Sequence, residues 1–161
     1  MRDIWVISDT HFGHRNIIRY CNRPFDDELQ MNEAMIERWN SVVKDGDIVY
    51  HLGDVYFGES GRILHKLKGR KRLVIGNHDV GKDQYLLRHF QKIMAWRMFP
   101  EYGLLLTHVP VHPNSLFKVS KNVHGHIHNQ LIDDERYVNV SVEQINYTPV
   151  HIETLKVNVS V

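Results

Sequence analysis

Several short apolar runs in this chain end in side chains that could bind metal ions. The candidate ligands follow these runs and are Asp9, His11, Asp54, Asn77, His108, His126 and His128. Mixed imidazole and carboxylate ligands suit Mn, Fe, Zn, Co or Ni rather than calcium. Seven groups are too many for one tetrahedral site. They fit two ions that share one bridging carboxylate.

Each pattern alone has an ordinary structural explanation. Asp-x-His recurs by chance, and Gly-Asp after a strand is commonly only a turn. A lone histidine such as His108 can simply be a hydrogen-bonded loop residue. The stronger motifs are Gly76-Asn77-His78-Asp79 and Gly125-His126-Ile127-His128. All of these motifs occur together, each at the end of an apolar run, and this combination favours a metal centre.

Two neighbouring divalent ions would define the chemistry of such a centre. Ions roughly 3.5–4 Å apart can clamp the attacking and leaving oxygens of an in-line displacement and activate a water as hydroxide. Their charge exceeds that of Asp9, Asp54 and a hydroxide together, so the site stays positive. This surplus suits a phosphate ester and argues against hydrolysis of a non-phosphate bond. Asn77 would bind through its side-chain carbonyl oxygen.

The composition predicts one globular domain that spans residues 1–161. The 161 residues are 42% hydrophobic and 24% charged, with a net charge of +1, which gives no general attraction to nucleic acid or membranes. Cys21 is the single cysteine, which excludes an intrachain disulfide and predicts a reducing compartment. The apolar run after Asp3 is too short for a signal peptide or a membrane span. We therefore expect a cytoplasmic protein that does not contact membranes.

The elements that must position these residues alternate between strands and helices in the first half of the chain. Strands are predicted over 2–8, 48–52, 71–75, 93–98, 104–107, 137–142 and 150–159, with a further one around Val123, and helices over 16–21, 26–43, 63–67 and 83–90. The helix over 26–43 should bury Leu29, Ile36, Trp39 and Val43, with Met35 and Val42 beside them. This order favours an α/β domain whose site lies at the C-terminal ends of strands.

The motif series resembles the calcineurin-like metallophosphoesterase family, in particular its small single-domain members from bacteria and phages. The resemblance implies a two-sheet β-sandwich flanked by helices, with the site at the C-terminal strand ends. It implies one ion held by Asp9, His11, Asp54 and His128. It implies a second ion held by Asp54, Asn77, His108 and His126, so that Asp54 is the bridge.

The resemblance also implies a catalytic role for His78, which would face the substrate and assist the leaving group. Asp79 would either orient His78 or fix the turn. Many relatives carry an Asp or Arg shortly after Gly-Asp, whereas Val55-Tyr56-Phe57-Gly58 follows here. The candidates for gripping phosphate instead are His14, Arg15 and Asn16.

We expect hydrolysis of phosphodiester or phosphomonoester bonds, with diesters preferred because they carry less negative charge. Manganese is the favoured metal, with Fe, Zn, Ni or Co as alternatives. The partner would be a phosphate ester, including a nucleotide or a nucleic-acid end. A catalytically weak metal-binding scaffold on the same fold is an alternative, as is a nuclease that acts on nucleic-acid ends. The basic residues from Arg62 to Arg72 could contact nucleic acid, although cations at a helix C-terminus explain them as well.

Overall fold

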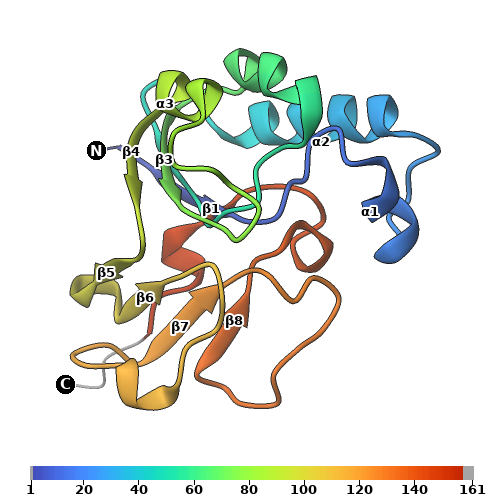
Figure 1. Cartoon of the computed structure of the whole chain (residues 1–161). Coiled ribbons are helices and arrows are strands. Elements are labelled where there is room, and N and C mark those ends of the chain that lie inside the picture. The colour runs from blue at the N-terminus through green and yellow to red at the C-terminus, as the bar shows by residue number, and fades with distance from the viewer. Residues whose placement is uncertain (1, 158–161) are drawn as a thin grey trace.

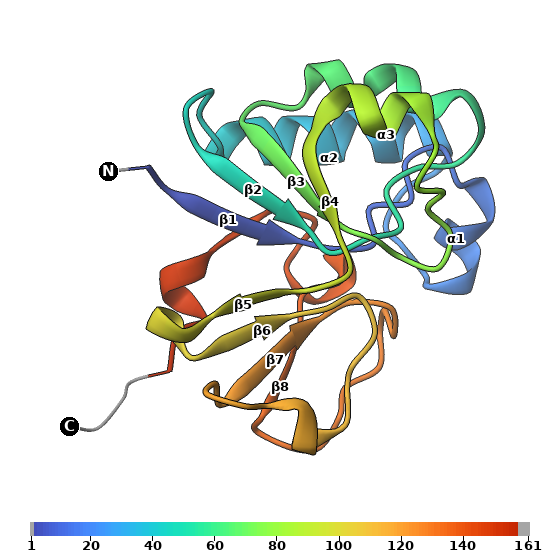
Figure 2. The same cartoon turned by 60° about the vertical axis from the view of Figure 1, so that its left-hand side comes forward.

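The computed structural model describes residues 2–157, which form two mixed β-sheets with helices over the outer face of the first sheet. Figure 2 shows the three layers, with helices above, the first sheet in the middle and the second sheet below. The α/β class and the two-sheet arrangement are therefore confirmed. Within the described residues, no helix combines the length and the apolar character needed to cross a membrane.

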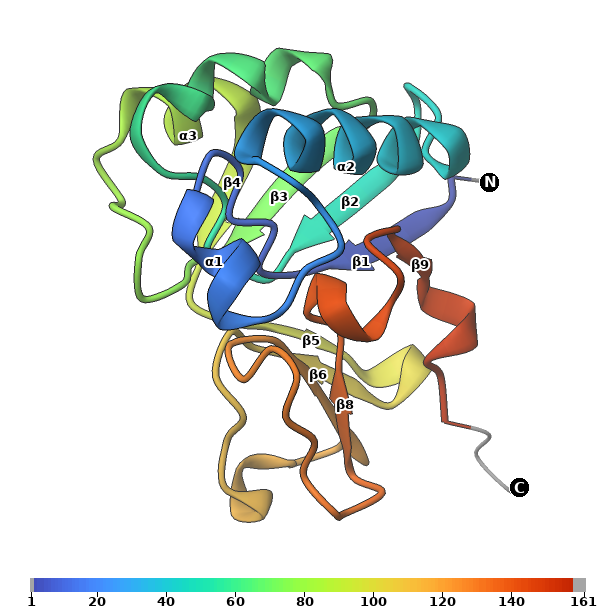
Figure 3. The same ribbon diagram turned by 90° about the vertical axis from the view of Figure 1, so that its right-hand side faces the viewer.

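The first sheet places three of the predicted site loops side by side. Its strands, in spatial order, are β4 (Phe90–Met94), β3 (Arg70–Val74), β2 (Ile48–His51), β1 (Ile4–Ile7) and β9 (Val150–His151). Strands β1 to β4 are parallel, and β9 runs antiparallel to β1. Figure 3 shows β9 next to β1 at the end of this sheet. Ile7 pairs with His51, which pairs with Leu73. The loops that follow these three strands therefore start at the same edge.

The second sheet supplies the remaining loops. Its spatial order is β5 (Arg97–Phe99), β6 (Leu104–Leu106), β7 (Lys121–His124) and β8 (Tyr137–Asn139). Strands β6, β7 and β8 are parallel, and Leu106 pairs with Val123. The segments after β6 and β7, which carry His108 and His126, therefore leave this sheet at one edge. A bridge between Ser8 and Ser141 joins this edge to the first sheet.

The helices bury one apolar layer against the first sheet. They are α1 (Arg15–Tyr20), α2 (Glu28–Val42) and α3 (Gln84–His89), together with a 3-10 helix over Gly58–Lys66. Asp27 caps α2 by accepting a hydrogen bond from the Gln30 amide. The fully buried side chains of α2 are Met31, Met35 and Trp39, at four-residue steps. Leu29 was expected on this face, but it is 68% exposed. It lies two residues before Met31, which is a rotation of about 200° around the helix axis, so it points away from the buried face.

Three predicted strands are wrong in extent. The predicted strand 137–142 keeps only Tyr137–Asn139, and Val142 begins a 3-10 helix over Val142–Gln144. The run 93–98 is divided between the sheets, since β4 ends at Met94, β5 begins at Arg97, and Ala95 and Trp96 cross between them. The predicted strand 150–159 keeps only Val150–His151. The His151 ring accepts a hydrogen bond from the Glu153 amide, which turns the chain into a 3-10 helix over Ile152–Thr154. Residues 158 and 159 lie outside the described part.

Candidate metal centre

The backbone at the predicted ligands is held in an unusual conformation. Five of them have positive φ angles, which residues with a β-carbon seldom adopt. They are Asp9 (57°), His11 (50°), Asp54 (57°), His126 (72°) and His128 (47°). Such conformations persist only where the surrounding structure enforces them, and they concentrate at functional sites.

The first group of candidate ligands consists of Asp9, His11 and His128. Asp9 Oδ1 lies 3.7 Å from His11 Nε2 and 3.8 Å from His128 Nε2. Asp9 Oδ1 and His11 Nε2 are buried and have no hydrogen-bond partner. These separations are too long for hydrogen bonds, but atoms that share one ion at bonds of about 2.1 Å lie about 3.0–3.5 Å apart. The group therefore fits a metal ion with little adjustment.

The second group gathers around His108. Its Nε2 lies 3.4 Å from Asp54 Oδ2, 2.8 Å from Asn77 Oδ1 and 3.2 Å from His126 Nδ1. Asn77 Oδ1 is also 3.0 Å from His126 Nδ1. One carboxylate, one amide oxygen and two imidazoles thus converge, which is a donor set suited to a transition metal.

Asp54 stands between the two groups. Its Oδ2 atom lies 3.6 Å from His11 Nε2 in the first group and 3.4 Å from His108 Nε2 in the second. The other carboxylate oxygen accepts a hydrogen bond from the His78 amide at 2.9 Å, which fixes the orientation of the group. One oxygen therefore faces both clusters, as a bridging ligand would.

Hydrogen bonds at the far side of two rings leave their Nε2 atoms free for a metal. His108 Nδ1 lies 2.7 Å from the Leu52 carbonyl oxygen, and His128 Nδ1 lies 2.7 Å from a carboxylate oxygen of Glu143. Both partners only accept, so each Nδ1 carries the proton and donates. In the neutral ring, Nε2 then presents its lone pair toward the cluster.

Two buried residues at this centre were missed by the sequence analysis. Arg23 donates to Glu143 Oε1 at 2.8 Å, to the Asp9 carbonyl at 2.8 Å and to the Thr10 carbonyl at 2.9 Å. The sequence analysis assigned no role to either residue, because an arginine and a glutamate 120 residues apart form no local pattern. Their pairing ties the last motif to the first, because Glu143 also contacts His128.

Glycines let the ligand loops approach one another closely. A β-carbon at Gly125 would collide with the Asp9 carboxylate and with Ser8. A β-carbon at Gly76 would lie 2.5 Å from the main-chain nitrogen of Asp54. The glycine that precedes Asn77 and the one that precedes His126 therefore make room for a carboxylate from another loop.

The charged groups of the cluster shift one another's ionisation. Burial alone would raise the pKa of Asp9, but the neighbouring His11 imidazole, the nearby His108 charge and the Ser8 hydroxyl lower it to about 2. Burial is likewise outweighed at Asp54, where His108 and His11 lower the carboxyl pKa. In turn, the two carboxylates raise the pKa of His11 and of His108 against the opposing effect of burial. The carboxylates are thus ionised and ready to bind a cation.

The loop after β3 holds His78 and Asp79 in different surroundings. The exposed His78 ring lies 5.9 Å from the His11 ring and 5.1 Å from the Phe57 ring, measured between centroids. The Asp79 carboxylate accepts hydrogen bonds from the main-chain amides of Asp54 (2.8 Å), Val55 (3.0 Å) and Gly76 (2.8 Å). These are the contacts of a residue that fixes the turn, the second of the two roles left open for it.

The three candidate phosphate-binding residues lie in two places. His14 Nδ1 is 3.0 Å from His11 Nδ1, and the His14 ring stacks on Phe57 with 4.2 Å between centroids. Arg15 is largely exposed and pairs with Glu28 of α2 at 3.9 Å. Arg15 and Asn16 line a shallow hollow that shares no residue with the ligand groups. A role for these residues in substrate binding stays a prediction.

Comparisons with known proteins show what this chain is similar to. The fold is similar to a solved protein of unknown function from Aquifex aeolicus, with a TM-score of 0.77, 26% identity, and coverage of 96% of this chain and 98% of that one. An uncharacterised protein of Methanocaldococcus jannaschii is 36% identical over 167 residues, which cover 96% of this chain and 90% of that protein. The Gene 66 protein of Mycobacterium phage L5 is 36% identical over 85 residues, 49% of this chain and 41% of the phage protein. Residues 1–149 match the calcineurin-like phosphoesterase superfamily domain, and the chain therefore belongs to this superfamily.

Proposed function

We propose that this phosphoesterase is a phosphodiesterase that works with two divalent ions, manganese being the favoured metal. The observation that carries the proposal is the position of Asp54 Oδ2, 3.6 Å from His11 Nε2 and 3.4 Å from His108 Nε2. A single carboxylate oxygen shared by two groups of ligand atoms is what a two-ion centre requires.

The proposed ligands fall into two sets that share Asp54. The first set is Asp9, His11, Asp54 and His128, and the second is Asp54, Asn77, His108 and His126. When bound, two such ions lower the pKa of a water and stabilise the charge that develops on the phosphoryl oxygens. Loops at the edges of the two sheets carry both ligand sets. Arg23 and Glu143 support the first set through their contacts with the Asp9 carbonyl and His128.

His78 is the proposed proton donor to the leaving oxygen. Its main-chain amide is tied to Asp54 at 2.9 Å, so the ring starts from a fixed point beside the cluster. The ring is exposed and lies next to Phe57, and both residues line one hollow. It can therefore reach a substrate without leaving its loop.

The preference for diesters rests on the positive groups near the cluster. Arg23 is buried there, but its guanidinium already serves Glu143 and two main-chain carbonyls. Phe57 occupies the stretch after Gly53-Asp54 in which many relatives have a charged residue. A diester carries one negative charge less than a monoester dianion and depends less on an added cation.

Two features bear on the alternatives. Buried ligand atoms without partners cost stability unless a metal binds them, which favours metal binding by the enzyme and by the scaffold alike, so that activity has to separate these two. Within the basic run, the Lys71 amine is buried and donates to the Leu67 and Gly69 carbonyls, at 2.7 and 3.1 Å. Lys71 therefore does not belong to an open surface for nucleic acid.

The test is to load metal-free protein with manganese and to compare bis(4-nitrophenyl) phosphate with 4-nitrophenyl phosphate. We expect about two ions per chain by elemental analysis and faster cleavage of the diester. A protein that binds both ions but cleaves neither ester would support the scaffold. Faster cleavage of the monoester would overturn the diester preference. Failure to bind manganese would overturn the choice of metal, and failure to bind Fe, Zn, Ni and Co as well would overturn the metal centre.

A further inference from the structure

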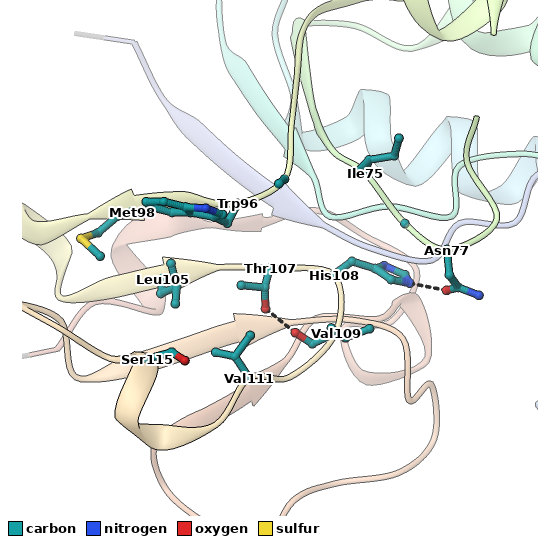
Figure 4. Close-up of a pocket in the computed structure, with 12 residues that line it drawn as sticks. Ile75, Asn77, Trp96, Met98, Leu105, Thr107, His108, Val109, Val111 and Ser115 are labelled. Atoms are coloured by element: carbon teal, nitrogen blue, oxygen red, sulfur yellow. Dashed lines mark hydrogen bonds between the residues drawn. The ribbon is translucent and has the colours of Figure 1, made fainter. Parts of the chain in front are cut away.

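An apolar groove of about 510 Å³ adjoins the second ligand group. Figure 4 shows Trp96 and Met98 along one side and the segment from Thr107 to Val111 along the other. Trp96 lies on the crossover between the two sheets, so the groove opens where the sheets separate. Asn77 and His108 form part of its wall, which makes the groove continuous with the ligands.

The lining accepts an uncharged, apolar group. The twelve residues that line the groove include no Asp, Glu, Lys or Arg. Ile75, Met98 and Leu105 provide apolar surface, and the Thr107 hydroxyl is already occupied, because it donates to the Val109 carbonyl and accepts from Asn122. The Trp96 indole is 57% exposed and offers a flat face for stacking.

The groove and His78 border separate hollows. His78 borders a separate hollow with Tyr56, Phe57 and Val80, and this hollow shares no lining residue with the groove. Asn77 lines the groove and His78 lines the other hollow, so two consecutive residues border the two spaces. A phosphodiester has two substituents, and the molecule offers each of them a place of its own.

We propose that this groove binds a planar, uncharged aromatic substituent that stays on phosphorus during hydrolysis, stacked on Trp96. The proposal rests on the phosphodiesterase function proposed above. Water forms the new P–O bond, the P–O bond to the other substituent breaks, and the departing oxygen takes a proton at His78. The aromatic group then leaves the groove as its phosphate monoester.

A pair of substrates with the same leaving group tests this with manganese-loaded protein. Bis(4-nitrophenyl) phosphate keeps an aryl group on phosphorus, whereas methyl 4-nitrophenyl phosphate keeps a methyl group. The ratio of their kcat/KM values should fall about three- to tenfold in Trp96→Ala, through loss of aromatic stacking. Phe117→Ala is the matched control, because Phe117 is an aromatic residue 69% exposed that does not line the groove.

An unchanged ratio in Trp96→Ala, or an equal fall in Phe117→Ala, would overturn the proposal. A binding measurement separates this outcome from failure of the phosphodiesterase function. Phenyl phosphate should quench the tryptophan fluorescence of the wild type but not of Trp96→Phe, and methyl phosphate should quench neither. If the protein cleaved neither diester, the proposed phosphodiesterase function would be refuted. The fluorescence titration with phenyl phosphate would still show whether the groove binds an aromatic group. Equal quenching by both monoesters would exclude aromatic selectivity.

Discussion

Glu143 lies 2.7 Å from Nδ1 of His128 and 2.8 Å from the guanidinium of Arg23. All three come from separate segments of the chain, and the glutamate and arginine side chains are almost completely buried. Arg23 in turn donates to the Asp9 carbonyl. The buried ion pair therefore fixes the spacing between Asp9 and His128, which come from the first and the last motifs and belong to the same ligand group.

Replacing Glu143 with glutamine should weaken metal binding without unfolding the chain. The amide keeps the shape of the side chain but is a weaker acceptor for His128 Nδ1–H. Loss of such a supporting contact costs about 10–100-fold in metal affinity. Titration with manganese measures this, with Glu153→Gln as the control, since Glu153 is an exposed residue paired with Lys156. Equal affinities in the two variants would show that Glu143 does not act through His128.

Replacing Asp54 with asparagine should disturb both ions. Its Oδ2 atom faces His11 and His108 at once, so the substitution removes a charge that both groups use. Asp9→Asn should disturb mainly the first ion, because Asp9 is close to His11 and His128. Elemental analysis of the two variants separates these outcomes. Retention of one full ion in Asp54→Asn would contradict the bridge.

The sequence predicts those parts of the site in which the ligand residues directly follow a strand. A strand followed by a ligand motif places its loop at the sheet edge, and β1, β2 and β3 follow this rule. The role of Glu143 could not be predicted, because it depends on an arginine 120 residues earlier in the chain. The break at Ala95-Trp96 was missed because apolar residues continue through it, and the choice between two sheets is a tertiary effect.

Asp79 gives a prediction about the loop rather than about proton transfer. Its carboxylate accepts three main-chain hydrogen bonds, and asparagine cannot replace all of them, since its NH2 group would meet an N–H donor. Asp79→Asn should lower the free energy of unfolding by about 1–3 kcal/mol. It should also slow cleavage of good and poor leaving groups alike. Denaturant unfolding measures the first effect. A stable variant that is slowed only on poor leaving groups would instead assign Asp79 to orienting His78.

The pH dependence follows from His11 and His108. In the metal-free protein, Asp54 and Asp9 raise the pKa of both rings above the ordinary 6.5. Their protonation therefore stabilises the metal-free fold fully below pH 6.5, and this contribution is lost as the pH rises through the raised values. A metal must displace the same protons, so manganese affinity should increase over that interval. Thermal unfolding without metal and titration with metal should thus change in opposite directions, and parallel changes would contradict the prediction.

His78→Ala separates proton transfer from metal binding. The ring is not among the proposed ligands, so the variant should keep both ions and the fold. Positioned proton transfer contributes about 10²–10⁴-fold in rate, and kcat should fall by this factor for an ester with a poor leaving group. The loss should shrink for nitrophenolate, which departs without a proton. Asp9→Asn is the contrasting variant, since it should lose metal and rate together on both esters. Metal content and kcat on two esters that differ in leaving-group pKa provide the measurement. An equal rate loss on both esters, or loss of an ion, would return His78 to a structural role in the loop.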